Sequence, residues 1–505
     1  MQNKKFSVLI KMLWSILICV LFTGSAIAST ISPVNDGFVS SDIKLLKESL
    51  QQINDVVRIN VLTPLMWMTL MSEHTILEFL FALINAGADV NAKNNDEYTP
   101  LIEAAKKANP EIIKTLIMSG ADVNATNKNG ETALMAAAYH NQNPEVITTL
   151  IENGADVNAK DINGYTPLKN AAFENPNPEI IKTLINAGAD VNVRDNYGRT
   201  PLFYAAISTN PESVKILINA GVDVNAKNID DKTPLMQAAL NDIPEMTEIL
   251  IISGADVNAK DRHGMTPLYH ATYNDNPEIA KSLIKAGADV NVKNNNGNTA
   301  LISALRSSNS KSEIVIALIN AGADVNAKNV DEETPLMCAI LSEFNTEVIK
   351  ILINTGADVN AQDLRGMTPL MLAAQFISNP EVITALIEAG ADVDAKNNDG
   401  KTPLMLAASK GEYEVIITLV NAGADVNARD LLGMTPLMCV ANSNYPRMGE
   451  VTTVLIEAGA DLNAKDNSGK AAIDYAEEYW SLKTIKIQRI FEEIIRLNEE
   501  VTRFR

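Results

Sequence analysis

Residues 99–132 read TPLIEAAKKANPEIIKTLIMSGADVNATNKNGET, and this stretch contains the start and stop signals of two helices. Thr99 can cap a first helix, and Pro100 suits the first helical position, where the helix needs no backbone N–H. The string NPE at 109–111 repeats these signals and adds an acidic residue at the positive end of a second helix. That helix has an apolar stripe and ends at Gly120, which readily takes the left-handed conformation that stops a helix. The stretch therefore predicts a pair of helices joined by a short loop.

The same unit recurs along most of the 505-residue chain, with 33 to 36 residues between successive copies. Each copy opens with Thr-Pro-Leu or Thr-Ala-Leu, at Thr63, Thr99, Thr132, Thr166, Thr200, Thr233, Thr266, Thr299, Thr334, Thr368, Thr402 and Thr435. Each closes with Gly-Ala-Asp-Val-Asn or a near variant, at Gly87, Gly120, Gly154, Gly188, Gly221, Gly254, Gly287, Gly322, Gly356, Gly390, Gly423 and Gly459. A degenerate thirteenth copy begins at 471–473. Between copies, a string such as NKNG at 127–130 predicts a tight turn on a projecting finger. A regular repeat of this length predicts an elongated stack rather than one globular core.

These strings and their spacing resemble the ankyrin-repeat family over residues 63–476. The resemblance implies an all-α solenoid of about 12 repeats, with helix-turn-helix units, β-hairpin-like fingers and a concave groove that binds other proteins. Where the family has Gly-His between the helices, this chain has Asn-Pro-Glu, at Asn143, Asn177, Asn210, Asn276 and Asn379. The family's His after Thr-Pro-Leu is replaced at Met66, Ile102, Met135, Lys169, Phe203, Met236, Tyr269, Ile302, Met337, Met371, Met405 and Met438. We therefore expect apolar contacts largely to substitute for hydrogen bonds between repeats through that His.

The N-terminal segment has the pattern of a secretory signal. Lys4 and Lys5 precede an apolar run at 12–22 and a small-residue string at 25–28. This pattern predicts a signal peptide over residues 1–28 that is cleaved before Ser29, so the protein would be periplasmic or secreted. The alternative is an uncleaved N-terminal anchor.

The two ends of the repeat stack need covering, because a terminal repeat would expose its apolar stacking face. We therefore expect an N-terminal capping segment at 29–62, ankyrin-like repeats at 63–470, and a capping repeat and helix at 471–505. The last part of the chain, at 485–504, has apolar residues at helical spacing among charges. It is expected to cap the stack, and the alternative is a coiled-coil or partner-binding helix.

The charge of the chain limits its partners. It has 42 basic and 62 acidic residues, a net charge of −20 at pH 7. Such an acidic surface repels phosphate, so it disfavours nucleic acids and anionic membranes. The composition therefore predicts a protein partner, and one with a basic face would fit.

Motifs for catalysis, cofactors or metals are missing from the sequence. Its histidines, at His74, His140, His263 and His270, lack the spacing of zinc ligands. The Asn-rich and Asp-rich fingers lack the spacing of a calcium loop. Cys338 and Cys439 lie three repeats apart, which is too far for a disulfide, and are expected to be small buried residues. We therefore expect a protein that is not an enzyme and that needs no cofactor.

Positions that vary between repeats are candidates for binding, because packing does not dictate them. The position seven residues after the repeat Thr carries large apolar residues, at Tyr139, Phe173, Ile207, Leu240, Tyr273 and Leu341. The position before the Thr adds Tyr98, Tyr165, Met265 and Met367. In an ankyrin-like fold the first set faces the groove and the second lies on the neighbouring fingers, so together they predict a partner-binding stripe. The alternative is that the linker between the helices folds over these side chains and buries them.

The sequence thus predicts a protein-binding scaffold that acts outside the cytoplasm through its concave groove and finger tips. The alternative is a structural spacer of the cell envelope without a single high-affinity ligand.

Overall fold

The computed structural model describes Met66 and residues 77–480, except 108, 209, 241–242, 308–311, 343–345 and 444–446. The expected signal peptide, the N-terminal capping segment and the helix expected at 485–504 lie outside the described residues. The described residues form two compact units. Unit 1 runs up to Ala238 and includes Glu248–Ala255, whereas unit 2 consists of Ala239–Thr247 and the residues from Asp256 onward.

The described part of the chain contains 24 helices and no strand, which confirms the predicted all-α repeat fold. The helices up to the boundary between the units are α4 (Leu77–Asn85), α5 (Pro100–Ala105), α6 (Pro110–Met118), α7 (Ala133–His140), α8 (Pro144–Glu152), α9 (Pro167–Glu174), α10 (Pro178–Asn186), α11 (Pro201–Ala205), α12 (Pro211–Asn219), α13 (Pro234–Ala238) and α14 (Pro244–Ile252). Those after it are α15 (Pro267–Ala271), α16 (Pro277–Lys285), α17 (Ala300–Leu305), α18 (Ser312–Asn320), α19 (Pro335–Leu341), α20 (Thr346–Asn354), α21 (Pro369–Phe376), α22 (Pro380–Glu388), α23 (Pro403–Lys410), α24 (Tyr413–Asn421), α25 (Pro436–Ala441), α26 (Met448–Glu457) and α27 (Ala472–Trp480).

The helices begin and end where the local sequence signals place them. Thr99 caps α5, since its Oγ1 accepts a hydrogen bond from the backbone N–H of Ile102 at 3.3 Å. Asn109 caps α6 in the same way, and Asn143 caps α8 through the N–H two residues on. The second helix of the unit stops before Gly120, whose φ of +93° lies in the left-handed region. These caps confirm the boundaries predicted from residues 99–132.

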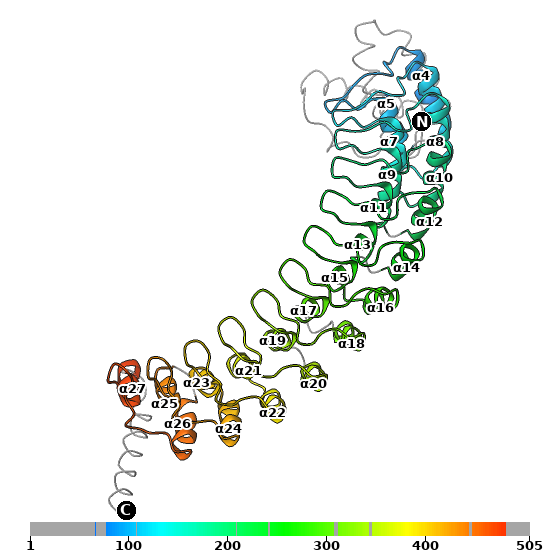
Figure 1. The fold of residues 1–505 in the computed structure, drawn as a ribbon. Helices are drawn as coiled ribbons and strands as arrows, with labels where there is room; N and C mark the ends of the chain where they lie inside the picture. The colour runs from blue at the N-terminus through cyan, green and yellow to red at the C-terminus, as the bar shows by residue number, and fades with distance from the viewer. Residues whose placement is uncertain are drawn as a thin grey trace, which may run out of the picture. The chain divides into compact units, whose positions relative to one another are not determined.

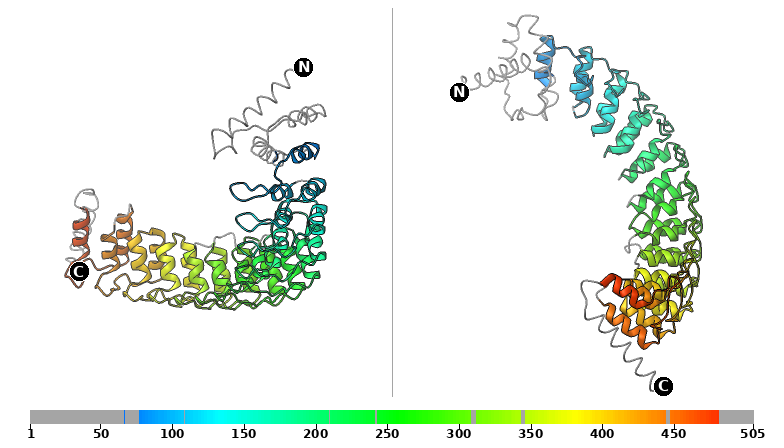
Figure 2. Two further views of the ribbon diagram at one scale, coloured as in Figure 1. Left: turned by 90° about the horizontal axis from the view of Figure 1, so that it is seen from above. Right: turned by 90° about the vertical axis from the view of Figure 1, so that its left-hand side faces the viewer.

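Within each unit the helices stack in two rows. In unit 1 the first helices of successive repeats, α5, α7, α9 and α11, contact one another, and so do the second helices α6, α8, α10 and α12 (Figures 1 and 2). The fingers project on the side of the first-helix row (Figure 1). Apolar residues such as Leu134 and Leu168 are fully buried between the layers. Burying a side chain of this size contributes roughly 1.5–3 kcal/mol, so stacking is the main stabilising term.

Each finger is a tight turn organised by one Asn or Asp. In the finger at 161–165, the N–H of Asp161 donates to the carbonyl of Tyr165 at 3.0 Å. The Asp161 carboxylate accepts the backbone N–H groups of Asn163 and Tyr165. Neighbouring fingers are joined directly, because the N–H of Ile162 donates to the carbonyl of Asn129 at 2.9 Å. The fingers therefore form a connected edge within the unit.

A ladder of asparagine side chains also joins successive repeats. Asn124, the last residue of a Gly-Ala-Asp-Val-Asn string, accepts a bond from the N–H of Asp156 and donates one to the carbonyl of Gly154, both at 2.9 Å. Both bonds recur at Asn91, Asn158, Asn258, Asn291, Asn326, Asn360 and Asn427. At Asp394 only the accepted bond, from the N–H of Asp425, is present. The expectation that apolar contacts largely replace polar bonding between repeats was therefore incomplete.

The two cysteines of the repeats are buried free thiols, as predicted from their positions. Burial raises the pKa of both Cys338 and Cys439 to about 12. Because the thiolate is the reactive form, these side chains serve packing rather than chemistry.

Candidate functional site

The predicted row at the ends of the first helices divides into exposed and half-buried residues. Tyr273 is 55% exposed and Leu341 is 37% exposed, both in unit 2. The other four members of the row are half-buried, at Tyr139, Phe173, Ile207 and Leu240. The structure thus leaves two of the six side chains exposed, Tyr273 more than Leu341.

The predicted residues on the fingers are less exposed than expected. Tyr98, Tyr165 and Met265 are half-buried. Met367 is only 4% exposed, and its Sδ accepts a hydrogen bond from the side-chain amide of Asn397 at 3.4 Å. Met367 therefore packs between repeats, and the expectation that it lies on the surface was wrong.

Exposed apolar residues lie instead at the very tips of the fingers. In unit 1 they are Ile162, Tyr197 and Ile229, on three successive fingers. In unit 2 they are Val330, Leu364, Leu431 and Leu432. The sequence analysis missed these residues, although comparing the two tip positions across all repeats would have revealed them. Exposed apolar side chains on consecutive fingers form a surface that favours contact with another molecule.

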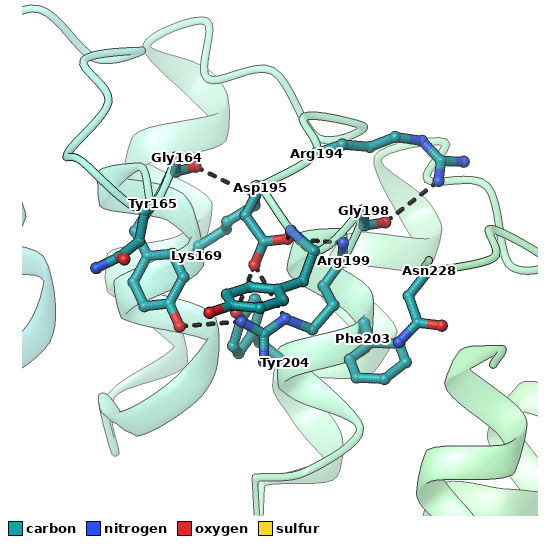
Figure 3. Close-up of polar contacts among 12 residues, drawn as sticks. Gly164, Tyr165, Lys169, Arg194, Asp195, Gly198, Arg199, Phe203, Tyr204 and Asn228 are labelled. Atoms are coloured by element: carbon teal, nitrogen blue, oxygen red, sulfur yellow. Dashed lines mark hydrogen bonds and ion pairs between the residues drawn. The ribbon is translucent and has the colours of Figure 1, made fainter. Parts of the chain in front are cut away.

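A polar cluster lies beneath the fingers of unit 1 and connects two adjacent repeats (Figure 3). Its centre is Asp195, whose side chain is fully buried. Oδ1 of Asp195 accepts the backbone N–H groups of Tyr197 and Arg199, and Oδ2 accepts the hydroxyl of Tyr204 at 2.6 Å and Nε of Arg199 at 3.0 Å. Burial alone would raise the pKa of Asp195, but the bond from Tyr204 and those from Arg199 outweigh burial and lower it. The Asp195 carboxylate is therefore negatively charged, and each of its two oxygens already accepts two hydrogen bonds.

Arg199 is the exposed edge of this cluster. Its Nη2 donates to the hydroxyl of Tyr165 in the preceding repeat at 3.1 Å. Its guanidinium carbon lies 4.5 Å from the ring centre of Tyr197 and 4.9 Å from that of Tyr204. Phe173 packs edge-on against Tyr204, with the ring centres 5.6 Å apart. The guanidinium is thus fixed among aromatic rings, while 22% of the Arg199 side chain remains exposed.

Lys169 is the unusual member of the cluster. It is 1% exposed, and its ammonium group has a single hydrogen bond in the described structure, to the carbonyl of Gly164 at 3.4 Å. Burial lowers the pKa of Lys169 to about 8, against the opposing attraction of Asp195. The other Thr-Pro-Leu and Thr-Ala-Leu repeats place a large apolar or aromatic residue at this position, and the degenerate last copy has Asp474. Burying an ammonium group with one long hydrogen bond costs free energy of folding. Because most other repeats fold without a charge at this position, the fold itself does not require Lys169.

Part of the cluster is a repeated structural device. The finger Asp also meets a side chain nine residues on in unit 2, where Asp261 lies 3.0 Å from His270 and Asp466 bonds to Tyr475. The Asp195–Tyr204 bond therefore belongs to a recurring pattern that ties a finger to its first helix. Lys169 and Arg199 are the additions that set this repeat pair apart.

The described residues contain neither a cluster of metal ligands nor a membrane span. No group of His, Cys, Asp or Glu among them could hold a metal ion. Among the same residues, no helix combines the length and the apolar character needed to cross a bilayer.

Paired helices in two rows with projecting fingers define a repeat solenoid, the class of protein that offers extended binding surfaces. Comparison with known families agrees with this class. The description "Ankyrin repeats (3 copies)" matches overlapping segments from 39–127 to 336–430, and "Ankyrin repeats (many copies)" matches 419–476. The chain belongs to the ankyrin-repeat family. A comparison with curated proteins gave no match. Ankyrin repeats generally mediate protein–protein interactions and are typically non-enzymatic scaffolds.

Proposed function

We propose that this protein is exported from the cytoplasm and binds a partner protein through its finger tips and the adjoining first-helix face. The observation that carries the proposal is the series of exposed apolar side chains on consecutive fingers, Ile162, Tyr197 and Ile229. Tyr273 and Leu341 extend the same kind of surface in unit 2. All five side chains are exposed, so a partner is the simplest reason for their apolar character.

The scaffold suits such a role energetically. The finger bonds and the asparagine ladder fix the backbone before any partner arrives, so little ordering entropy is lost on binding. Aromatic and large aliphatic anchors on a fixed frame are typical of residues that dominate binding energy.

The binding proposal is tested with the double variant Tyr273→Ser and Leu341→Ser. We choose these residues over Phe173 because Phe173 is half-buried against Tyr204, whereas Tyr273 and Leu341 are exposed, although the Tyr273 ring also lies 6.0 Å from that of Tyr269. The partner is first captured from the native source with the chain from Ser29 onward and identified by mass spectrometry. We expect the double variant to lose about tenfold or more in affinity for that partner, because each anchor leaves an apolar contact unfilled. Its thermal midpoint should remain close to that of the parent.

The control is Met118→Ser, which removes an exposed side chain from the C-terminal end of a second helix, α6. It should bind the partner as the parent does. Unchanged affinity in the double variant would contradict binding through Tyr273 and Leu341, and failure to capture any partner would favour the alternative function, a structural spacer without a high-affinity ligand.

Export is supported by the sequence pattern of residues 1–28. N-terminal sequencing of the protein recovered from its native cells should begin at Ser29. Recovery of intact Met1 in a membrane fraction would contradict cleavage and support the anchor.

A further inference from the structure

We propose that the two fingers at 160–165 and 194–199, together with Lys169, form a recognition site for a carboxylate. The carboxylate is supplied by an Asp or Glu side chain on an acidic, partly apolar segment of the protein partner. This inference rests on the proposed protein-binding function and names the chemistry of one contact.

The first argument is local charge. The two fingers and Lys169 carry four basic residues, Lys160, Lys169, Arg194 and Arg199, against only Asp161 and Asp195. The chain as a whole has a net charge of −20. Lys160 and Arg194 are exposed, so the positive potential reaches the surface at this place. An acidic segment is therefore attracted here, although the rest of the protein repels it.

The second argument is the bonding of Arg199. Its Nε and Nη2 are held by Asp195 and by the hydroxyl of Tyr165, whereas no acceptor among the described residues bonds to Nη1. Asp195 cannot supply more, because its oxygens already accept four bonds. A planar guanidinium with free donors on an exposed edge matches the geometry of an incoming carboxylate.

The third argument is that the aromatic rings of the cluster are not available to a cationic ligand. Aromatic residues around an open space can bind a cation, but here the rings of Tyr197 and Tyr204 already face the guanidinium of Arg199. The site is therefore occupied by its own cation and presents positive charge outward. The Arg199 side chain is only 22% exposed, and a partly buried charge binds an anion more strongly than a fully solvated one.

The neighbourhood also predicts what accompanies the carboxylate. Ile162, Tyr197 and Ile229 are exposed on the same row of finger tips. An acidic side chain that reaches Arg199 brings its flanking residues against these apolar tips. We therefore expect the acidic residue to stand beside large apolar residues in the bound segment.

The test screens the protein chain from Ser29 onward against a displayed random peptide library. Peptides that bind the parent but not Arg199→Gln should be enriched in Asp or Glu next to apolar residues. Replacing that Glu by Gln in a synthetic peptide should weaken binding roughly tenfold, because a charge-assisted hydrogen-bond pair is lost. The same peptide change should have little further effect in Arg199→Gln, because the two changes remove one interaction.

Matched variants separate recognition from folding. Arg365 is bonded to Asp363 on a finger of unit 2, and no cation–ring contact of Arg365 occurs among the described residues, so Arg365→Gln should bind the selected peptides like the parent. Lys169→Met removes a buried positive charge and leaves the exposed charges of the site unchanged. It should weaken peptide binding a few-fold while the fold persists.

Several results would overturn the inference. These are the absence of any binder that depends on Arg199, binders without acidic residues, an equal loss in Arg365→Gln, or a preference for phosphorylated over carboxylate peptides. If Arg199→Gln binds the captured partner normally while the Tyr273 and Leu341 double variant does not, the carboxylate site fails but the proposed function stands. If both variants bind the captured partner normally, the binding surface assigned in the proposed function fails as well, and if no partner is captured, partner binding itself fails.

Discussion

Replacing Lys169 by methionine should raise the free energy of unfolding by about 2–3 kcal/mol at pH 7. The parent buries an ammonium group with one long hydrogen bond, and its lowered pKa of about 8 reflects the cost of that burial. Methionine occupies the same position in other repeats, for example at Met236 and Met371, and is fully buried there. The change therefore removes a charge and restores the side chain that the packing of this fold already accepts. Chemical denaturation of both proteins measures the difference.

The stability gained by Lys169→Met over the parent should decrease as the pH rises. The pKa of Lys169 falls from 10.5 to about 8 on folding. Between these values the unfolded chain keeps a proton that the folded chain has lost, so the stability of the parent rises with pH in this window. The advantage of the methionine variant should be complete below pH 8 and disappear as the pH approaches 10.5.

Lys160→Met serves as the control, because Lys160 is exposed on the neighbouring finger. It should change stability by less than about 0.5 kcal/mol. A lower thermal midpoint for Lys169→Met would show that the ammonium is better solvated than its burial indicates.

Replacing Asp195 by asparagine should cost about 3 kcal/mol or more. Asparagine keeps the acceptor that organises the turn, and other fingers use Asn127 or Asn228 at this position. What is lost is the negative charge that compensates Arg199 and Lys169 in a buried setting, together with the Oδ2 atom that accepts the bonds from Tyr204 and Arg199. The expected loss therefore measures the buried charge and the two bonds to Oδ2 rather than turn formation.

Asp430→Asn provides the matched comparison. Asp430 is also buried and accepts the N–H groups of Leu432 and Met434, but none of the ion pairs among the described residues involves it. Its replacement should cost less than about 1 kcal/mol. Combining Asp195→Asn with Lys169→Met should reduce the loss, because one of the two uncompensated charges is then absent. Equal losses at Asp195 and Asp430 would disprove the role assigned to the charge.

The fold was predictable because its signals are local. Thr99 and Asn109 cap helices within a few residues of their own position, and the apolar stripe of each helix is read directly from its spacing. The asparagine ladder was not predicted, since Asn124 has the sequence context of a turn residue and its partners lie about 30 residues away. Contacts at that distance depend on how repeats stack rather than on the order of neighbouring residues.

The candidate site was predictable only in part for the same reason. Tyr273 and Met367 are both large and apolar at variable positions, yet one is exposed and the other is buried by the next repeat. Lys169 was visible as a departure from the repeat, but its significance depends on Asp195, 26 residues later. Exposure and charge compensation are properties of two adjoining repeats, and no single repeat encodes them.

The asparagine ladder also bears on how a chain of this kind can lengthen by gene duplication. Each asparagine side chain bonds only to backbone atoms of the following repeat, the carbonyl of a glycine and the N–H of an aspartate. After a repeat is duplicated or deleted, the neighbouring repeats can therefore form the same asparagine-to-backbone bonds, whatever side chains the fingers carry. Asp394 shows that this joint also tolerates drift, because it retains the accepted bond from Asp425 at 2.8 Å. Repeats can thus be exchanged as whole units while the residues at their finger tips change.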